Sequence, residues 1–309
     1  MDPPVFSRQL GDELCALVST IDSPLVDVTP LAGMGYPGYQ PSAFRLRFAD
    51  GCLLKGRRFG SASRAATVEY VLQHVDHPGF PKVLARSGKT LLMEWVEGQP
   101  LNSADCTLEG LRQCGALQGV MHCVQVPEGS PYQPHDPIQE RHAKLKRDLT
   151  VLAETRVLNE SEAQHSFSLA MRYAPRDYAI GFVHRDFCVE NLIRRPSGDM
   201  CVIDNETLAI DAYDYDLGRT WYRWPLRLWQ RQAYLDGYQR YRSAKDFLAH
   251  FPYWGIAAVV GAAVFRVQKH IQATLPPTRM LRLLLHDLEQ GGDAEELAFR
   301  SWTGVTGND

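Results

Sequence analysis

Two acids and an amide stand at intervals that suit metal and proton chemistry. Asp186 and Asn191 lie in the stretch FVHRDFCVEN, and Asp204 follows thirteen positions after Asn191. The turn-forming PSGD (Pro196 to Asp199) between them predicts a four-residue loop, which places Asn191 opposite Asp204 on antiparallel strands. Opposite residues lie about 4.5–5.5 Å apart, so an amide and a carboxylate oxygen could share Mg²⁺, which takes its other ligands from phosphates and water. Asp186 in the preceding loop could accept a hydroxyl proton, which completes the parts of a phosphoryl transfer.

The first hundred residues are predicted to form antiparallel strands with one inserted helix. Residues 7–20 favour a short helix, and SAFRLRF and CLLKGRRF indicate two strands joined by the turn Ala49–Gly51. SASRAATVEYVLQHV has serine caps and helical apolar spacing. PKVLAR and TLLMEWV predict another hairpin. These elements form a β-rich N-terminal lobe.

A Gly/Pro break, EGQPLN (Glu97 to Asn102), marks the predicted lobe boundary. After it, TLEGLRQCGALQGVMHCV, IQERHAKLKRDLTVLAETRV and SEAQHSFSLAMRYAPRD have helical periodicity, and the C-terminal third is also helical. We therefore expect an α+β fold with a nucleotide-binding N-lobe at residues 1–97 and a catalytic and substrate-binding C-lobe at residues 98–309. A cleft between two such lobes is a usual ligand site.

The pattern H-x-D-x-x-x-x-N followed by a strand-borne aspartate resembles the catalytic loop of the protein-kinase-like superfamily. It looks most like the aminoglycoside phosphotransferase and choline kinase family, because the second acid lies in VIDNE rather than D-F-G. DYDLGRTW resembles that family's D-x-x-x-D-L-A helix start, and ALQGVMHCVQVP its A-L-x-x-L-H helix end. No A-P-E triplet follows, unlike in protein kinases. The resemblance covers about residues 30–240 and implies a bilobal kinase-like fold that uses ATP and Mg²⁺.

The resemblance also assigns residues in the N-terminal half. Lys55 in CLLKGRRF and Glu69 in ATVEYV match the Lys–Glu pair that holds the ATP phosphates in the superfamily. LLMEWVEGQPL resembles the family hinge, so the carbonyl of Glu94 and the amide of Val96 would contact the adenine edge.

GMGYPG satisfies the spacing G-x-G-x-x-G with Gly33, Gly35 and Gly38. A dinucleotide-binding interpretation would need a strand before it and a helix after it, whereas here a strand follows. A loop over the ATP phosphates, with Gly33 and Gly35 near them, fits better.

Several residues have two interpretations. His184 either braces the loop or takes part in catalysis, and Glu206 is either a second metal ligand or solvated. Arg57 lies on the same strand face as Lys55, so a register slip would exchange their roles. Glu69 could instead form a surface pair within its own helix. Asp216 is expected to brace the catalytic loop.

The aromatic run DYDLGRTWYRWPLRLW leaves two further alternatives for the acceptor. Its rings could form a cation–π box for an ammonium group or simply pack in the core. After Trp221 there are eleven Lys/Arg and eight Asp/Glu, which argues mildly against a polycationic aminoglycoside.

Composition limits the remaining classes. The chain has 309 residues and a formal net charge of -3, so no bulk attraction to nucleic acid or anionic membrane is expected. The seven cysteines lack a C-x-x-C pair, and the N-terminus lacks a signal-peptide pattern. WGIAAVVGAAVF is too short to span a bilayer. We expect a cytoplasmic protein whose partner is a small-molecule hydroxyl compound and whose oligomeric state the sequence leaves open.

The leading hypothesis is an ATP-dependent phosphotransferase with Asp186 as base and Asn191 and Asp204 as metal ligands. The alternatives are a catalytically silent nucleotide-binding module and a kinase acting on a protein or lipopolysaccharide.

Overall fold

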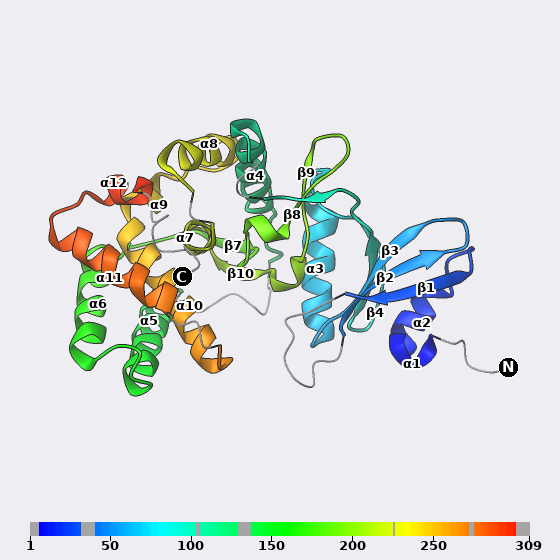
Figure 1. The fold of residues 1–309 in the computed structure, drawn as a ribbon, viewed down its shortest axis with the longest axis horizontal. Helices are drawn as coiled ribbons and strands as arrows, with labels where there is room; N and C mark the ends of the chain where they lie inside the picture. Colours follow the sequence, from blue (N-terminus) through cyan, green and yellow to red (C-terminus); the bar gives the residue numbers. More distant parts are fainter. Residues whose placement is uncertain are drawn as a thin grey trace. The chain divides into compact units, whose positions relative to one another are not determined.

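The computed structural model describes residues 6–31, 41–102, 106–128, 137–224, 226–271 and 275–300. The chain divides into two compact units (Figure 1). The first unit contains Met1–Leu101 and Asn191–Leu208, and the second contains Asn102–Glu190 and Ala209–Asp309. The first carries the antiparallel sheet and the second is mainly helical, which confirms the predicted α+β class. The functional division into lobes at residues 97 and 98 stays a prediction.

A five-stranded antiparallel sheet organises the first unit, in the order β1-β2-β3-β5-β4. Its strands are β1 (Leu25–Pro30), β2 (Ala43–Phe48), β3 (Leu53–Arg58), β4 (Val83–Ser87) and β5 (Thr90–Glu94). Both predicted hairpins are confirmed. Gly51, with φ 86°, supplies the left-handed residue that the turn between β2 and β3 requires.

Helix α2 (Asp12–Val18) covers one face of this sheet. Its Leu14 packs so close to Gly56 of β3 that a Cβ there would overlap the leucine methyl groups. Because side chains alternate along a strand, Lys55 and Arg57 of β3 lie on the other face. Helix α3 (Ala62–His74), capped by Ser61 as the sequence predicts, is the helix on that face, since its Glu69 reaches Arg86 of β4.

Two features of the N-terminal region differ in detail from the prediction. The helix expected over residues 7–20 forms as α1 (Ser7–Leu10) and α2, separated by Gly11 with φ 73°. Strand β1 was not predicted. It pairs only with β2 at the edge of the sheet and ends in Pro30, so it lacks the apolar alternation of a central strand.

A small sheet of β6 (Gln99–Pro100), β8 (Leu192–Arg194) and β9 (Met200–Val202) completes the first unit, followed by the 3₁₀ turn η3 (Asn205–Thr207). The predicted hairpin is present, but its predicted register is wrong by one residue. Arg194 rather than Arg195 pairs with Met200, because the loop has one residue more than predicted and closes through a hydrogen bond from the Arg195 N–H to the Asp199 carbonyl. Asn191 therefore stands opposite Ile203, whose N–H donates to the Asn191 carbonyl at 2.9 Å.

The second unit consists of helices around a short antiparallel pair of strands, β7 (Ile180–Val183) and β10 (Ala209–Ala212). The three helices predicted after the boundary are α4, α5 and α6, and the C-terminal third is helical as expected. The helices are α4 (Leu108–Met121), α5 (Pro137–Glu154), α6 (Glu160–Arg172), α7 (Tyr213–Arg223), α8 (Leu228–Tyr238), α9 (Lys245–Ala249), α10 (Phe251–Gln268), α11 (Leu275–Glu289) and α12 (Ala294–Phe299). The 3₁₀ turn η2 (Val189–Asn191) leads from the second unit into the first.

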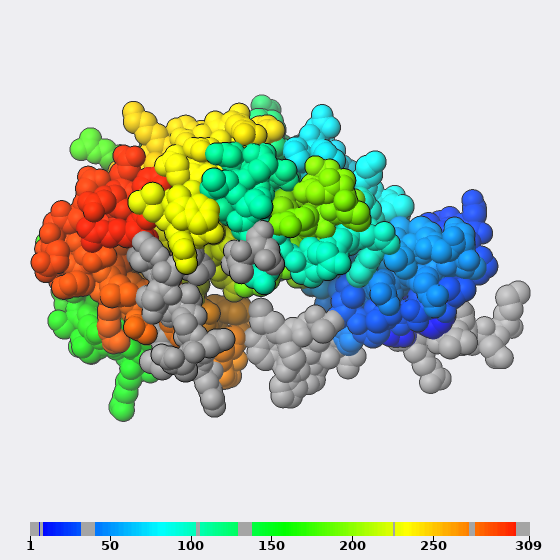
Figure 2. Space-filling view, turned by 45° about the horizontal axis from the view of Figure 1, so that its top comes forward, coloured from blue at the N-terminus to red at the C-terminus, as the bar shows by residue number. Residues whose placement is uncertain are grey.

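Glycines allow α4 and α8 to pack with their backbones in contact. A Cβ on Gly115 of α4 would overlap the Tyr234 carbonyl of α8, and one on Gly237 of α8 would overlap the Arg112 carbonyl of α4. The surfaces of the two helices lie side by side in Figure 2, where α4 is teal and α8 is yellow. This contact fixes α4, which carries two of the side chains that brace the catalytic loop.

Helix α10 is the most deeply buried element of the second unit. It contains the apolar stretch singled out in the sequence, and it packs against α5, α7 and α11. None of the helices in the described ranges combines the length and apolar character that a bilayer span requires.

Candidate active site

The loop that carries Asp186 is held in place by a buried carboxylate. Asp216 in α7 is fully buried and accepts hydrogen bonds from the backbone N–H groups of Arg185, at 2.6 Å, and His184, at 3.3 Å. Arg185 has φ 64°, a left-handed conformation that these two bonds help to hold. Asp216 thus braces the loop, as the sequence predicts.

Gln118 of α4 and His122, the residue that caps the end of this helix, complete the environment of Asp216. Gln118 donates to its Oδ2 at 2.9 Å, and His122 Nε2 lies 3.1 Å from the same atom. Burial lowers the pKa of His122, although its hydrogen bond to Asp216 opposes this, so the ring is neutral at pH 7 and donates from Nε2. Burial alone would raise the pKa of Asp216, but the hydrogen bonds from His122 and Gln118 outweigh it and lower that pKa. The loop therefore rests on an ionised, hydrogen-bonded carboxylate.

Asp186 lies between two arginines of α7. Its Oδ1 is 3.5 Å from Nε of Arg223 and 3.7 Å from Nη2 of Arg219, and its side chain is 27% exposed. Burial lowers the pKa of Arg223, but the neighbouring Asp186 carboxylate outweighs burial and raises it. The carboxylate is thus oriented by fixed cations and still open to a ligand.

Cys188, in the same loop, is buried, and burial raises the pKa of its thiol to about 12. A neutral thiol is a poor nucleophile, which argues against a nucleophilic role for Cys188. His184 is buried as well, and its ring lies edge-on to that of Phe187 with centroids 5.8 Å apart. This places His184 in the packing under the loop.

In the first unit, Lys55 and Asp204 face each other. Lys55 Nζ lies 3.3 Å from Asp204 Oδ1, and the Asp204 side chain is 51% exposed. Asp204 has φ 59° and ψ 42°, a left-handed conformation that Asp tolerates better than most residues. Asp204 lies beyond β9, which ends at Val202, so the pleat of the strand does not set the direction of its side chain. The register premise for pairing Asn191 with Asp204 fails, and their joint metal ligation stays a prediction.

The predicted pairing of Lys55 with Glu69 is not what the structure has. Glu69 Oε2 is bound by Arg86 Nε at 2.5 Å, and Lys55 is bound by Asp204. Glu69 of α3 thus pairs with an arginine of strand β4, which is neither the predicted lysine nor the alternative of a surface pair within the helix. Glu206, left open between metal ligand and solvated acid, pairs with Arg57 at 2.7 Å. Lys55 and Arg57 thus each have a separate carboxylate partner.

The segment that resembles the hinge is also held by a salt bridge. Glu94, at the end of β5, accepts from Arg195 Nη1 at 2.9 Å and from the Lys82 N–H at 3.1 Å. Val96 lies in the extended segment between β5 and β6. Gly33 and Gly35, predicted to approach the phosphates, lie outside the described residues.

One family model covers more than half of the chain. The model of the phosphotransferase enzyme family matches residues 38–251. The chain belongs to this family. No curated protein sequence matches it significantly.

Solved structures with the same fold include three kinases of small molecules. An aminoglycoside phosphotransferase from Alicyclobacillus acidocaldarius is 14% identical, with TM-score 0.60 over 91% of this chain and 96% of that chain. Choline kinase LicA from Streptococcus pneumoniae is 16% identical, with TM-score 0.60 over 88% and 97%. Amicoumacin kinase hAmiN, in complex with AMP-PNP and Ca²⁺, is 16% identical, with TM-score 0.60 over 96% and 100%. At these identities the likeness shows the fold alone.

The sequence prediction did not include Arg219 and Arg223, which the structure places beside Asp186. The signal was available, because they follow Asp216 by three and seven positions and so share its helical face. A helix that turns Asp216 toward the catalytic loop must turn these arginines toward it as well.

The first two tryptophans of the aromatic run belong to the core, whereas Trp229 is exposed. Trp221 and Trp224 are each 1% exposed, and both rings lie edge-on to Tyr234. Trp221 Nε1 donates to the Ala298 carbonyl at 2.7 Å. Core packing is therefore the correct alternative for these two rings, not an ammonium-binding box.

Proposed function

We propose that this chain transfers the γ-phosphoryl group of ATP to a hydroxyl group of a small molecule, with Asp186 as general base. The observation that carries the proposal is the setting of Asp186: a partly exposed carboxylate on a loop braced by Asp216 and flanked by Arg219 and Arg223. Family membership supports a small-molecule phosphotransferase.

In the reaction, the acceptor oxygen forms a bond to the γ-phosphorus while the bond from the γ-phosphorus to the β,γ-bridging oxygen breaks. The acceptor's proton passes to Asp186, and ADP leaves with the bridging oxygen. Holding the hydroxyl in line and in contact with the base contributes through positioning, which is the larger part of catalysis in this reaction class.

The nucleotide is assigned to the first unit. Lys55, whose ion-pair partner among the described residues is the exposed Asp204, is the cation proposed to contact the phosphates. The Glu94 carbonyl and the Val96 amide are proposed for the adenine edge, and Glu69 is proposed to act only through Arg86 and the placement of α3.

A divalent cation fits the donor set in part. Asp204 offers an exposed carboxylate oxygen and Asn191 an amide oxygen, which are hard ligands suited to Mg²⁺. Within the described ranges no three His, Cys, Asp or Glu side chains cluster as a metal site, as expected where a nucleotide supplies most ligands. Bound Mg²⁺ would offset the charge of the phosphates. The amicoumacin kinase structure contains AMP-PNP with Ca²⁺, which supports a nucleotide with a divalent cation here.

All seven cysteines are free thiols. A chain that leaves every cysteine unpaired suits a reducing compartment, so we place the activity in the cytoplasm. The net charge of -3 gives no reason to propose a nucleic-acid partner.

The test compares Asp186→Asn with the wild-type protein in transfer of label from γ-labelled ATP to a panel of amino alcohols, sugars and antibiotics. The variant should bind a fluorescent ATP analogue normally and lose about 10²–10⁴-fold in transfer rate, the usual contribution of a general base. Glu190→Gln is the matched control, because this exposed acid lies in the same loop and should leave the rate unchanged. Equal rates for Asp186→Asn and wild type would exclude the base.

The same assay decides between the proposal and its alternatives. Tight ATP binding with no label transferred to any compound would identify a silent nucleotide-binding module. Label on a protein or lipopolysaccharide, and on no small molecule, would identify a macromolecular kinase.

A further inference from the structure

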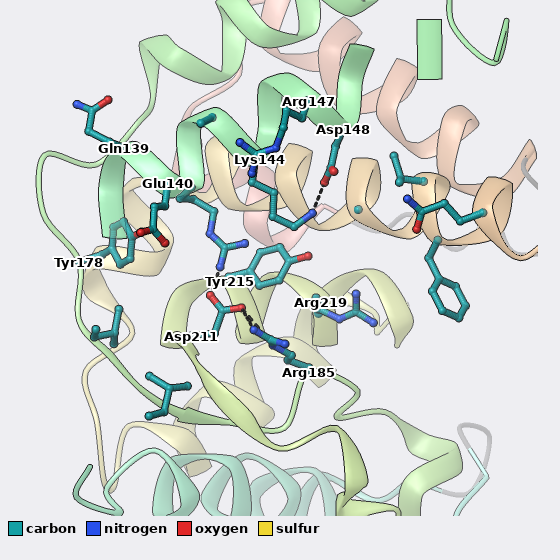
Figure 3. Close-up of a pocket in the computed structure, with 18 residues that line it drawn as sticks. Gln139, Glu140, Lys144, Arg147, Asp148, Tyr178, Arg185, Asp211, Tyr215 and Arg219 are labelled. Atoms are coloured by element: carbon teal, nitrogen blue, oxygen red, sulfur yellow. Dashed lines mark hydrogen bonds and ion pairs between the residues drawn. The ribbon is translucent and has the colours of Figure 1, made fainter. Parts of the chain in front are cut away.

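A cavity of about 940 Å³ opens within the second unit, beside the catalytic loop (Figure 3). Four elements supply its walls: α5, the β7–β10 pair with its loop, α7 and α10. The lining residues used below are Lys144, Arg147, Arg185, Asp211, Tyr215 and Arg219. A volume of this size holds a small organic molecule.

The lining is predominantly cationic. Five Lys or Arg side chains and three Asp or Glu side chains face the cavity. Asp211 is shared by two arginines: Arg185 Nη2 lies 2.9 Å from its Oδ2, and Arg141 binds its Oδ1. One carboxylate thus faces two cations, and the group keeps a net positive charge.

The cavity wall formed by α5 and α7 also carries more positive than negative charge. Lys144 is neutralised by Asp148 at 2.6 Å. Arg147 forms no ion pair with any residue in the described ranges. Arg219 lies 3.7 Å from Asp186 and also forms a hydrogen bond with the Tyr215 hydroxyl. The Arg147 guanidinium therefore remains for a ligand, and the other N–H groups of Arg219 lie on the same cavity wall.

The ionisation of Tyr215 responds to the same positive field. Burial by itself would raise the pKa of this phenol, but the nearby Arg219, Arg141 and Lys144 outweigh burial and lower it. The Arg141 guanidinium lies over the Tyr215 ring, 4.2 Å from its centroid. The positive charge of the cavity wall thus favours the ionised, negatively charged form of the Tyr215 side chain.

The cavity is connected to the proposed base. Arg219 lines the cavity and also lies beside Asp186, and Arg185 precedes Asp186 directly in the chain. A molecule bound among these arginines is therefore placed next to the carboxylate that would take its proton.

We propose that this cavity binds the acceptor, and that the acceptor is a hydroxyl compound carrying an anionic group such as a carboxylate or phosphate. The anionic group pairs with Arg147 and Arg219, and the carbon skeleton packs on the apolar part of the wall, which is formed by Ile180, Ile210 and Val264. A polycationic acceptor would be repelled by the five Lys and Arg side chains that line the cavity. This inference rests on the proposed phosphotransferase function and adds the charge class of its substrate.

The experiment measures binding by calorimetry with the nucleotide site filled by AMP-PNP and Mg²⁺. Two matched series differ in charge on one skeleton: glucose, glucosamine and glucose 6-phosphate, and glycerol, serinol and glycerate. In each series the anion should bind at least about 10-fold more tightly than the other two compounds, and added salt should weaken it. The double variant Lys144→Gln with Arg147→Gln should lose this preference. Lys146→Gln, an exposed change on the opposite side of α5, should retain it.

The outcomes separate the two proposals. A neutral or cationic member that binds as tightly as the anion, no detectable binding of either anion, or an unchanged preference in the double variant overturns the anionic acceptor. Label transfer from ATP, measured in parallel, tests the function. Transfer to cationic compounds refutes only the charge class, whereas selective anion binding with no transfer to any compound refutes only the phosphotransferase function.

Discussion

Replacing Asp216 by Asn should destabilise the second unit far more than an ordinary surface change. The substitution keeps the size of the side chain and one acceptor oxygen. That oxygen can still accept from the Arg185 N–H, which is now 2.6 Å from the carboxylate. The other oxygen becomes an amide that donates, and it then faces donors from His184 and Gln118 at 3.3 Å and 2.9 Å.

The size of the effect follows from these contacts. Each buried donor left without an acceptor costs about 1–3 kcal/mol, and breaking a buried charged network costs about 3–5 kcal/mol. His122 can offset part of this by changing tautomer, although it then gives up the present arrangement with Tyr238, 2.9 Å away. We therefore expect a loss of about 3–5 kcal/mol in the free energy of unfolding.

Urea unfolding at pH 8, followed by tryptophan fluorescence, measures this loss because Trp221 and Trp224 are buried near the network. The matched control is Asp214→Asn, two residues earlier in α7. Burial raises the pKa of Asp214 to about 7, so its removal should not destabilise the protein at pH 8. A loss below about 1 kcal/mol for Asp216→Asn, or equal losses for both variants, would show that the bracing argument is wrong.

Three further changes test other parts of the structure. The pKa of Asp214 is about 7 in the folded protein and ordinarily 3.8. The stability that the protonated Asp214 contributes in the wild type is therefore lost as the pH rises through 7. The free energy of unfolding of Asp214→Asn, measured in urea, should rise by roughly 1–3 kcal/mol relative to that of the wild type between pH 5 and pH 8. Lys55→Met should lower kcat/KM for ATP about 100-fold, the scale of one charged hydrogen bond, whereas Arg57→Met, whose partner is Glu206, should lower it less than about 3-fold; equal effects would refute the assignment. Gly115→Val should cost more than about 3 kcal/mol by overlap with the Tyr234 carbonyl, and a thermal melt equal to wild type would contradict that contact.

Local elements of this chain could be predicted because their signals are local. The helix α3 has a serine cap and helical apolar spacing, and the β2–β3 turn has the glycine that a positive φ requires. Strand β1 lacked such signals, since an edge strand with a proline has no apolar alternation. The register of the β8–β9 hairpin failed for a related reason: PSGD marks a turn, but the loop length depends on which residues close it.

The partners of the charged residues could not be predicted from motif spacing. Lys55 and Glu69 fit the expected pattern in the sequence, yet the rotation of α3 on the sheet brings Glu69 to Arg86 and leaves Lys55 to Asp204. A carboxylate bonds to whichever cation its helix faces, and that is set by packing. The bracing role of Asp216 was predictable because it depends on a short local motif, the start of the helix in DYDLGRTW.

The charge of the acceptor cavity depends on tertiary structure alone. Arg141 and Arg185 reach Asp211 from 70 and 26 positions away in the sequence, so no window of the chain contains the excess. The count of charges after Trp221 does not bear on this cavity, because all five of its Lys and Arg residues precede Trp221 in the sequence. The fold is shared at 16% identity with choline kinase LicA, and a likeness of that kind leaves the charge of the cavity undetermined. That charge has to be taken from this chain's own side chains on α5, α7 and the loop after β7.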